Sequence, residues 1–286
     1  MCDKKKKISF SKMHGLGNDF IVFDKINQNF LLNSSIIQKI SNRNTGIGCD
    51  QVLIVEKSNN IKFDFYYRIF NSDGSEASQC GNGARCFAYF VYLKKLTQKK
   101  SIIVKTKYNS LLINIIDKDN IIVNMGKPLF NINNIPNFSI SNFQIHDIKV
   151  DNNIFYFSEI FIGNPHCVIL VKDIDHAPVD TVGSFLNQNS RFKNGVNVNF
   201  MKIISSNHIM LRVYERGVGE TQACGSGACA SVVSGIIQNV LKKDVIVELM
   251  GGVLKISWGG FNHSVYMNGP AKHVYDGYIN YSFLYS

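Results

Sequence analysis

Residues 68–84 read RIFNSDGSEASQCGNGA, and residues 212–228 read RVYERGVGETQACGSGA. The two stretches align without gaps at a separation of about 144 residues, which is half the chain. Both contain the pentad Cys-Gly-x-Gly-Ala, and the matched pairs are Arg68 with Arg212, Glu76 with Glu220, and Cys80 with Cys224. A repeat of this length predicts a fold built from two similar halves.

The repeat continues outside the two pentads. The motifs GLGN and IGN place Asn18 opposite Asn164, and Gln51 falls opposite Asn197 at the same spacing of 146 residues. A single pentad could recur by chance in a chain of this length, but several matches in the same order do not. The collinear matches therefore support the prediction of two similar halves.

Hydrophobic periodicity predicts the same order of elements in both halves. In the first half we expect a strand at 62–70, a helix at about 82–95, and strands near 101–107, 110–116 and 120–125. In the second half we expect a strand at 208–215, a helix at about 226–241, and strands near 244–250, 252–258 and 263–268. Shorter helices are expected near 34–42 and 180–188. The predicted fold class is α+β, with two pseudo-symmetric domains, each an antiparallel β-sheet or barrel wrapped around a central helix.

The same pattern predicts where the two domains divide. We expect one domain over residues 1–126 and a second over 127–269, with the hinge near Gly126 to Pro128. Residues 270–286 are expected to cross back to the first domain.

Composition narrows the class of protein. The chain is 45% hydrophobic and 18% charged, which is typical of globular proteins, and its apolar runs are far shorter than the roughly 20 residues of a membrane span. The N-terminal lysines are not followed by an apolar segment, so no secretory signal is predicted and we expect a cytoplasmic protein. The net charge of +10 comes from scattered lysine pairs without a nucleic-acid motif, so we expect no nucleic-acid or membrane partner.

The seven cysteines predict neither a disulfide framework nor a metal site. Their number is odd, the pentad cysteines are spaced C-x5-C and C-x4-C from the next cysteine, and no histidine pair completes a zinc ligand set. No lysine lies in a motif that suggests a pyridoxal Schiff base. We therefore expect no metal and no cofactor.

The two pentad cysteines are candidate acid/base residues. Each directly precedes a Gly-rich turn that opens a predicted helix, where the free N–H groups lower a thiol pKa from about 8.5 toward neutrality. The same N–H groups can bind a carboxylate. If two similar halves face each other, Cys80 and Cys224 would lie on opposite faces of one stereocentre, and such a pair can invert a carbon.

Other polar residues suit an amino-acid ligand. Five asparagines lie in or beside Gly-rich segments, where they are either turn residues or contacts to a zwitterion: Asn18, Asn71, Asn82, Asn164 and Asn197. Glu215 and Arg216 form either a surface ion pair or a site for an ammonium and a carboxylate. His166 is either a core histidine or a partner that shares a proton with a cysteine.

Taken together, these motifs resemble the diaminopimelate epimerase family. The resemblance runs through nearly the whole chain, in MHGLGNDF (13–20), GCDQ (48–51), NSDGSEASQCGNGARC (71–86), GNPH (163–166), GVNVNF (195–200), YERGVGETQACGSGA (214–228) and HVYDG (273–277). It implies an isomerase that converts LL-2,6-diaminopimelate to the meso form, in lysine and peptidoglycan-precursor biosynthesis, without pyridoxal phosphate or metal. The chain departs from the family pattern in its four-lysine N-terminal extension and in Asn199, where many relatives carry a small residue.

The resemblance also implies roles for individual residues. Cys80 and Cys224 are expected to be the proton donor and acceptor, with His166 and Glu215 setting their protonation. The implied substrate contacts are Asn18, Gln51, Asn71, Gly81, Asn82, Asn164, Asn197, Glu215, Arg216, Gly225 and Ser226. Tyr275 matches a tyrosine at the family's dimer interface, so we expect a homodimer.

Two other functions stay open at this level. Proline racemases and hydroxyproline epimerases resemble this pattern and also use two cysteines, although Glu215-Arg216 and MHGLGNDF favour the larger diaminopimelate. A non-catalytic amino-acid or anion binding protein could be built on the same repeat, but it would not need both thiols.

Overall fold

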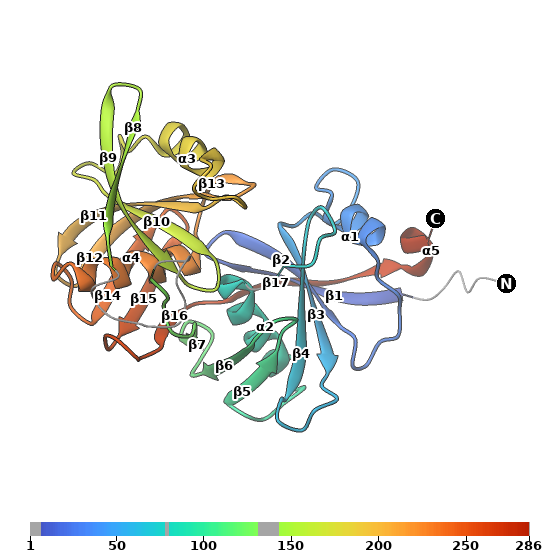
Figure 1. Cartoon of the computed structure of the whole chain (residues 1–286). Coiled ribbons are helices and arrows are strands. Elements are labelled where there is room, and N and C mark those ends of the chain that lie inside the picture. The colour runs from blue at the N-terminus through green and yellow to red at the C-terminus, as the bar shows by residue number, and fades with distance from the viewer. Residues whose placement is uncertain (1–6, 78–79, 131–142, 286) are drawn as a thin grey trace. The chain divides into compact units, whose positions relative to one another are not determined.

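The computed structural model describes residues 7–77, 80–130 and 143–285 (Figure 1). The chain divides into two compact units, of which the first comprises residues 1–123 and 269–286 and the second comprises 124–268. The elements in chain order are β1 (Lys7–Gly15), β2 (Asn18–Asp24), α1 (Ser34–Ser41), β3 (Gln51–Lys57), β4 (Phe65–Asn71), α2 (Gly81–Leu93), β5 (Ser101–Lys105), β6 (Ser110–Ile115), β7 (Ile121–Asn124), β8 (Ile145–Val150), β9 (Asn153–Phe161), β10 (Pro165–Leu170), α3 (Val179–Gln188), β11 (Asn197–Ser205), β12 (His208–Glu215), β13 (Gly219–Thr221), α4 (Gly225–Ile237), β14 (Asp244–Leu249), β15 (Gly252–Trp258), β16 (Val265–Gly269), β17 (Lys272–Asn280) and α5 (Tyr281–Tyr285).

The two units have the same strand order and the same strand directions. In the first unit the strands pair as β17-β1-β2-β3-β4-β5-β6-β7, and in the second as β8-β9-β10-β11-β12-β14-β15-β16. In both series the third and fifth pairings are parallel and the others are antiparallel. The α+β class with two pseudo-symmetric halves is therefore confirmed, with mixed rather than purely antiparallel sheets.

Strand register makes the internal equivalence explicit. Phe20 on β2 pairs with Gln51 on β3, and His166 on β10 pairs with Asn197 on β11. These two parallel pairings occupy the same place in the two units. The register therefore equates Phe20 with His166 and agrees with the spacing of 146 residues in the sequence.

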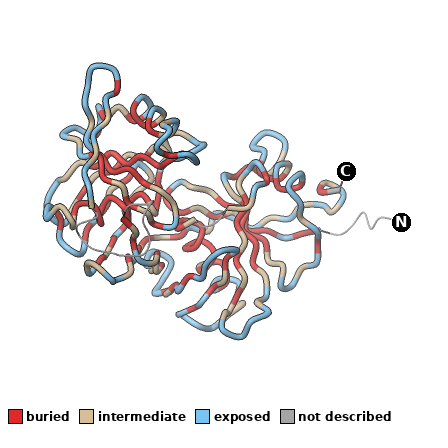
Figure 2. Tube along the Cα trace, viewed as in Figure 1, coloured by how far each residue is buried: buried red, intermediate tan, exposed pale blue. Residues whose placement is uncertain are grey.

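Each sheet surrounds one central helix. Helix α2 packs against β1, β2, β3, β6 and β17, and α4 packs against β9, β10, β11 and β15. Both helices are buried over most of their length, as the buried segments in Figure 2 show. A helix that is apolar and small-residue-rich on most sides can lie inside a sheet, because it has no polar face that needs water. The central helices thus fix where their first residues, and the preceding cysteines, are placed.

Both central helices were predicted from the sequence, but their predicted last residues lie too far along the chain. Helix α2 ends at Leu93 rather than near 95, and α4 ends at Ile237 rather than near 241. Lys95 and Asn239 have φ angles of 55° and 58°, a left-handed conformation that cannot continue a helix. Strands β1 to β3, β8 to β11, β13 and β17 are additional to those expected. None of the described helices is long and apolar enough to cross a lipid bilayer.

A repeated ion pair holds the segment that leads into each central helix. Arg68 on β4 donates to both carboxylate oxygens of Glu76, at 2.8 and 3.3 Å. Arg212 on β12 binds Glu220 in the same way, at 2.6 and 2.9 Å. The backbone bridges Phe70 to Glu76 and Tyr214 to Glu220 accompany these pairs. The matched Arg and Glu residues of the repeat thus form equivalent contacts.

We expect Glu220→Gln to lower the free energy of unfolding by about 1 kcal/mol, because a two-bonded, partly buried Arg–Glu pair contributes more than an exposed one. Urea unfolding at pH 7 measures this change. Asp173→Asn is the matched control in the same unit, since the Asp173–His176 pair is largely exposed, and it should change stability far less. Equal effects of the two substitutions would contradict this account.

Candidate active site

In the first unit the candidate residues, called the first half-site, lie around the start of α2. Cys80 is the N-cap residue, and its sulfur accepts a hydrogen bond from the Gly83 N–H at 3.3 Å. The thiol also lies 3.6 Å from Asn18 Oδ1, and Asn82 Nδ2 donates to the same oxygen at 3.4 Å. The structure therefore brings Asn18, Cys80 and Asn82 together.

Asn18 is placed by a tight turn. Leu16 and Gly17 form the two-residue connection between β1 and β2, with φ angles of 56° and 87°. Two consecutive left-handed residues are what a type I′ hairpin turn requires, and Leu16 is an unusual residue in that conformation. The turn sets Asn18 at the first position of β2, opposite Gly15.

Gln51 and Asn71 form a second polar pair in the first unit. Gln51 Nε2 donates to Asn71 Oδ1 at 2.9 Å, and Asn71 Nδ2 donates to Ser75 at 3.0 Å. Gln51 Oε1 is buried and has no hydrogen-bond partner among the residues that the structure describes. A buried acceptor without a partner costs free energy, so this oxygen is a candidate ligand contact.

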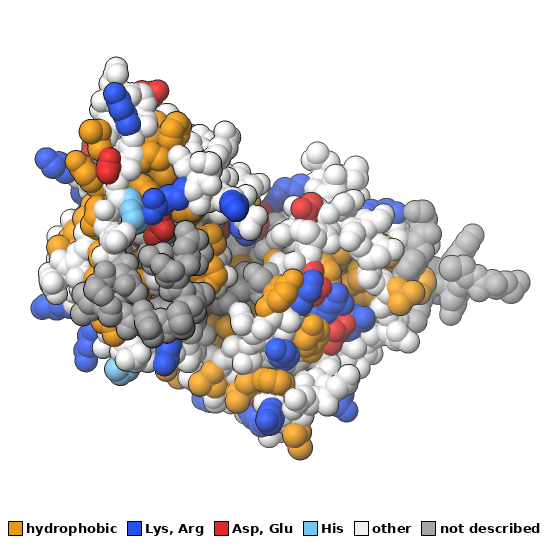
Figure 3. All heavy atoms as spheres, viewed as in Figure 1, with side chains coloured by type: hydrophobic (Ala, Val, Ile, Leu, Met, Phe, Trp, Pro, Cys, Tyr) orange, Lys and Arg blue, Asp and Glu red, His pale blue; other side chains and the backbone are white. Residues whose placement is uncertain are grey.

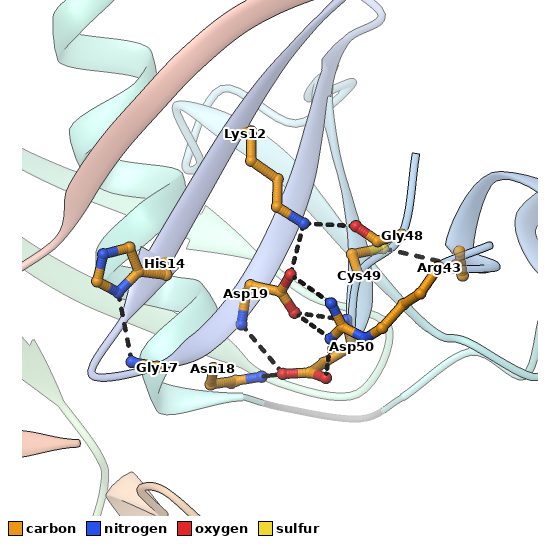
Figure 4. A network of polar contacts seen from close by, with 10 residues as sticks. Lys12, His14, Gly17, Asn18, Asp19, Arg43, Gly48, Cys49 and Asp50 are labelled. Atoms are coloured by element: carbon orange, nitrogen blue, oxygen red, sulfur yellow. Dashed lines mark hydrogen bonds and ion pairs between the residues drawn. The ribbon is translucent and has the colours of Figure 1, made fainter. Parts of the chain in front are cut away.

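An ionic network flanks this half-site, and sequence reasoning did not single it out (Figure 4). Arg43 binds both carboxylate oxygens of Asp19, at 2.7 and 3.0 Å, and also reaches Asp50 at 2.7 Å. Lys12 binds Asp19 and the Gly48 carbonyl. Burial would raise the pKa of Asp19, but the hydrogen bonds from Arg43 and Lys12 outweigh it and hold that pKa well below its usual range.

A second charged group missed from the sequence is Arg85 on α2. Its side chain is fully buried, and it donates to Asn82 Oδ1 and to the Pro270 carbonyl, both at 3.0 Å. Asp19 and Asp50 lie inside the quoted motifs MHGLGNDF and GCDQ, and Arg85 lies inside NSDGSEASQCGNGARC. Asp19, Asp50 and Arg85 could have been identified from the sequence, because each is a charged residue within a motif made largely of small and amide residues.

In the second unit the candidate residues, called the second half-site, lie around the start of α4. Cys224 is the N-cap residue, is only 4% exposed, and lies 3.6 Å from the Ser226 hydroxyl. Glu215, at the end of β12, accepts a hydrogen bond from Thr221 at 2.7 Å. Gly225 and Ser226 are the first two residues of α4, as Gly81 and Asn82 are of α2.

The expectation of a lowered thiol pKa is wrong for Cys224. Burial raises its pKa well above the usual value, and the Glu215 carboxylate raises it further. Hydrogen bonds from Ser226 and the Gly227 N–H act in the opposite direction but are weaker. The helix terminus is therefore outweighed by desolvation and by a nearby negative charge.

His166 is fully buried between two asparagines. Nδ1 lies 3.3 Å from Asn199 Nδ2, and Nε2 lies 2.9 Å from Asn164 Oδ1. Because Asn199 Nδ2 also donates to the Cys167 carbonyl at 2.8 Å, it is the donor to Nδ1, and the imidazole proton belongs on Nε2. Burial, followed by the Arg216 charge, lowers the pKa of His166 to about 3. The ring is a neutral donor that fixes Asn164.

The Asn199 side chain lies close to the backbone of Gly227 in the second unit. It is fully buried, and a Cβ atom added at Gly227 would lie 2.2 Å from its Oδ1. The equivalent glycine of the first pentad, Gly83, lies against the Tyr67 hydroxyl, where an added Cβ would lie at 2.5 Å. The second glycine of each pentad is thus needed because a polar side chain touches the helix there.

Asn197 and Arg216 lie together at the edge of the second half-site. Asn197 Oδ1 accepts from the Arg216 backbone N–H at 3.0 Å, and Arg216 Nη1 donates to the Asn194 carbonyl at 2.9 Å. Arg216 is exposed. Tyr275 belongs to the first unit, on β17, where the residue is 45% exposed and its ring contacts Phe10.

No group of three or more His, Cys, Asp or Glu side chains suited to a metal ion occurs within residues 7–77, 80–130 and 143–285. Lysine and arginine side chains are dispersed over the face of the molecule drawn in Figure 3, without a continuous basic stripe on that face.

Solved structures with this fold include several epimerases. A hydroxyproline epimerase from Agrobacterium vitis matches with a TM-score of 0.72 at 11% identity, over 97% of this chain and 93% of that one. A phenazine biosynthesis protein from Bacillus anthracis matches with a TM-score of 0.69 at 16% identity, over 96% of this chain and 99% of that one. At such low identity these likenesses establish the fold alone.

Sequence comparison identifies the family. The family model described as diaminopimelate epimerase matches residues 10–130 and 159–274. The diaminopimelate epimerase of Buchnera aphidicola subsp. Baizongia pistaciae is 53% identical over 277 residues, covering 96% of this chain and 97% of that protein. That of Buchnera aphidicola subsp. Acyrthosiphon pisum (strain 5A) is 54% identical over 278 residues, with the same coverage. The chain belongs to the diaminopimelate epimerase family, and it is an isomerase.

We expect the low pKa of His166 to make the fold acid-sensitive. Below pH 6.5 the unfolded chain binds a proton at this residue, whereas the folded protein does not until about pH 3, so stability falls as the pH drops through this window. Between pH 7 and pH 5 the free energy of unfolding should fall by roughly 2 kcal/mol more in the wild type than in His166→Gln. Urea unfolding at both pH values measures the difference. His176→Gln is the exposed control. Because Asp173 raises the pKa of His176, the wild type should gain unfolding free energy relative to this variant as the pH falls.

Glu215→Gln should lower the pKa of Cys224, because it removes the charge that opposes the thiolate. The rate of Cys224 alkylation by iodoacetamide, followed by peptide mass spectrometry, should therefore rise at lower pH than in the wild type. Glu220→Gln is the matched control, since that carboxylate is bound to Arg212. Identical pH dependences for Glu215→Gln and the wild type would rule out the proposed influence of Glu215.

Proposed function

We propose that the protein converts LL-2,6-diaminopimelate to the meso form by two-base proton transfer between Cys80 and Cys224. One cysteine, as thiolate, removes the proton from the α-carbon, and the other, as thiol, delivers a proton to the opposite face. The first cysteine ends the reaction as a thiol and the second as a thiolate, so the net change is inversion of one centre. The observation that carries this proposal is that both thiols are N-cap residues of equivalent central helices.

The first turn of each helix suits the carboxylate of the reacting centre. The leading N–H groups of a helix have no partner within the helix and lie at its positive end. In this chain they belong to Gly81 and Asn82 in one unit and to Gly225 and Ser226 in the other. We assign these residues to the α-carboxylate, whose negative charge increases when the α-proton leaves.

The polar residues around the thiols are assigned to the rest of the substrate. Family membership and the contacts described above support substrate-binding roles for Asn18, Gln51, Asn71, Asn164, Asn197, Glu215 and Arg216. Glu215 also favours the protonated form of Cys224, so it can act on catalysis through that thiol. For His166 the geometry favours positioning of Asn164 over direct proton transfer, because both ring nitrogens are hydrogen bonded.

Further parts of the proposal concern cofactors, assembly and location. We propose that the reaction needs neither pyridoxal phosphate nor a metal ion, so activity should survive dialysis against a chelator. We also propose that the protein acts in the cytoplasm, in lysine and peptidoglycan-precursor synthesis. The exposed Tyr275 on β17 is the residue we assign to a homodimer interface.

The two-base mechanism predicts the isotope content of the product. In deuterated water, meso product formed early should carry deuterium at the inverted carbon, while recovered LL substrate should be largely undeuterated. The reason is that the delivering thiol has exchanged with solvent, whereas the proton removed goes to the other cysteine. Mass spectrometry of the separated isomers measures both. Original hydrogen in the early product would indicate a single base serving both faces.

Single substitutions of the two cysteines test the same mechanism independently. Cys80→Ala and Cys224→Ala should each abolish epimerisation, because water is a poor substitute for a positioned acid or base. Cys86→Ala, a buried cysteine outside the proposed mechanism, is the control for general damage. Assays with LL-diaminopimelate and with proline distinguish the proposed reaction from proline racemisation. Epimerisation at a near wild-type rate by either alanine variant would refute the proposal.

A further inference from the structure

The Asn18 side chain is held at both ends of its amide. Its Nδ2 donates to Asp50 Oδ2 at 3.0 Å (Figure 4). Its Oδ1 lies 3.6 Å from the Cys80 sulfur. A carboxylate can only accept hydrogen bonds, so it selects the NH₂ end of the amide. The carbonyl end is consequently the one that faces the thiol.

Asp50 is itself fixed by charged and backbone donors. The guanidinium of Arg43 binds Asp50 Oδ1 at 2.7 Å, and the Asp19 backbone N–H donates to Oδ2 at 3.1 Å. Arg43 is anchored in turn by its two bonds to Asp19, whose side chain is 16% exposed against 45% for Asp50. The more buried Asp19 thus supports the network, and Asp50 is the member that reaches the candidate site.

We propose that Asp50 is a positioning residue for the acid/base chemistry of Cys80, acting through the orientation of the Asn18 amide. With Oδ1 toward the sulfur, Asn18 accepts from the Cys80 thiol and directs its proton. With the amide reversed, Nδ2 would face the sulfur and favour the thiolate instead. This inference rests on the proposed role of Cys80, but the orientation itself can be tested without catalysis.

The second unit holds the equivalent asparagine differently. Strand register equates Asn18 with Asn164, and the position equivalent to Asp50 is Val196. There, the His166 Nε2–H binds Asn164 Oδ1, so the amide is held by its carbonyl end rather than by its NH₂ end. A carboxylate that contacts this amide is therefore a feature of the first unit and not a general requirement of the repeated fold.

Asp50→Asn tests the proposal with little change in size. Three donors meet the Asp50 carboxylate, from Arg43, from the Asp19 backbone and from Asn18. An amide has one acceptor oxygen, and the Arg43 charge favours that oxygen at the Oδ1 position. The new NH₂ group would then take the Oδ2 position and face Asn18 Nδ2, which favours the reversed Asn18 amide against the one donor from Asn82 that still binds Asn18 Oδ1.

We expect two results for Asp50→Asn. Cys80 should be alkylated by iodoacetamide at least about threefold faster at pH 7, because a donor now faces its sulfur. The value of kcat/KM for LL-diaminopimelate should fall about tenfold or more, because small errors in the placement of catalytic groups are costly. Since Asp50 is nearly half exposed, urea unfolding should change little.

Two controls separate positioning from a structural role. Asp24→Asn removes a carboxylate at the other end of β2, where it accepts from Ile26 and Asn27 of the following loop, and should leave both Cys80 alkylation and kcat/KM near wild type. In an Asn18→Ala background, Asp50→Asn should cause no further loss of kcat/KM, because the amide through which Asp50 acts on Cys80 is absent. Asp50→Ala, which removes the acceptor altogether, replaces Asp50→Asn if the latter does not fold.

The possible outcomes are distinct. Unchanged Cys80 alkylation in Asp50→Asn, or losses that add fully to those of Asn18→Ala, would overturn the positioning role. If the wild type does not epimerise diaminopimelate, the proposed function fails, yet the alkylation rates still decide whether Asp50 orients Asn18. If the wild type is active and Asp50→Asn matches Asp24→Asn in both measurements, only the positioning role fails.

Discussion

The start of each central helix is the constraint on which the rest of the structure depends. The N–H groups in the first turn of a buried helix need partners. Cys80 and Cys224 occupy the N-cap positions, where the Cys80 sulfur accepts from the Gly83 N–H and Cys224 makes no side-chain capping bond. The helices must also be nearly apolar to lie inside their sheets, so these first turns are where polar chemistry concentrates. The surrounding strands bring amide and carboxylate side chains to these points, and the Arg–Glu pairs hold the segments that enter the helices.

The two halves share this geometry but differ in electrostatics. Cys80 is partly exposed and lies beside Asn18, which is fixed by a carboxylate within an ionic network. Cys224 is buried beside Glu215, which raises its thiol pKa. His166 stays neutral because burial and Arg216 both oppose its protonated form. A symmetric backbone thus surrounds each thiol with a different set of charges.

Much of the fold could be predicted from the sequence. The repeat predicted two similar halves, and the local pattern placed the central helices within a few residues, because apolar periodicity and Gly-rich turns are encoded in consecutive residues. The motifs also led to the correct family. The boundaries at Lys95 and Asn239 were missed, because a left-handed residue that is not glycine gives little signal in the sequence.

By itself, the sequence determined the repeated architecture, the family, and the two cysteines that precede equivalent helices. Only the tertiary structure decided the environment of those thiols. Within the network of Lys12, Asp19, Arg43 and Asp50, the contact between residues farthest apart in the sequence joins Lys12 to Gly48, 36 positions away. No local pattern predicts such contacts. The raised pKa of Cys224 likewise depends on burial and on a carboxylate from another strand. Burial and the distances between charges arise only when distant segments pack together, and these two quantities control protonation.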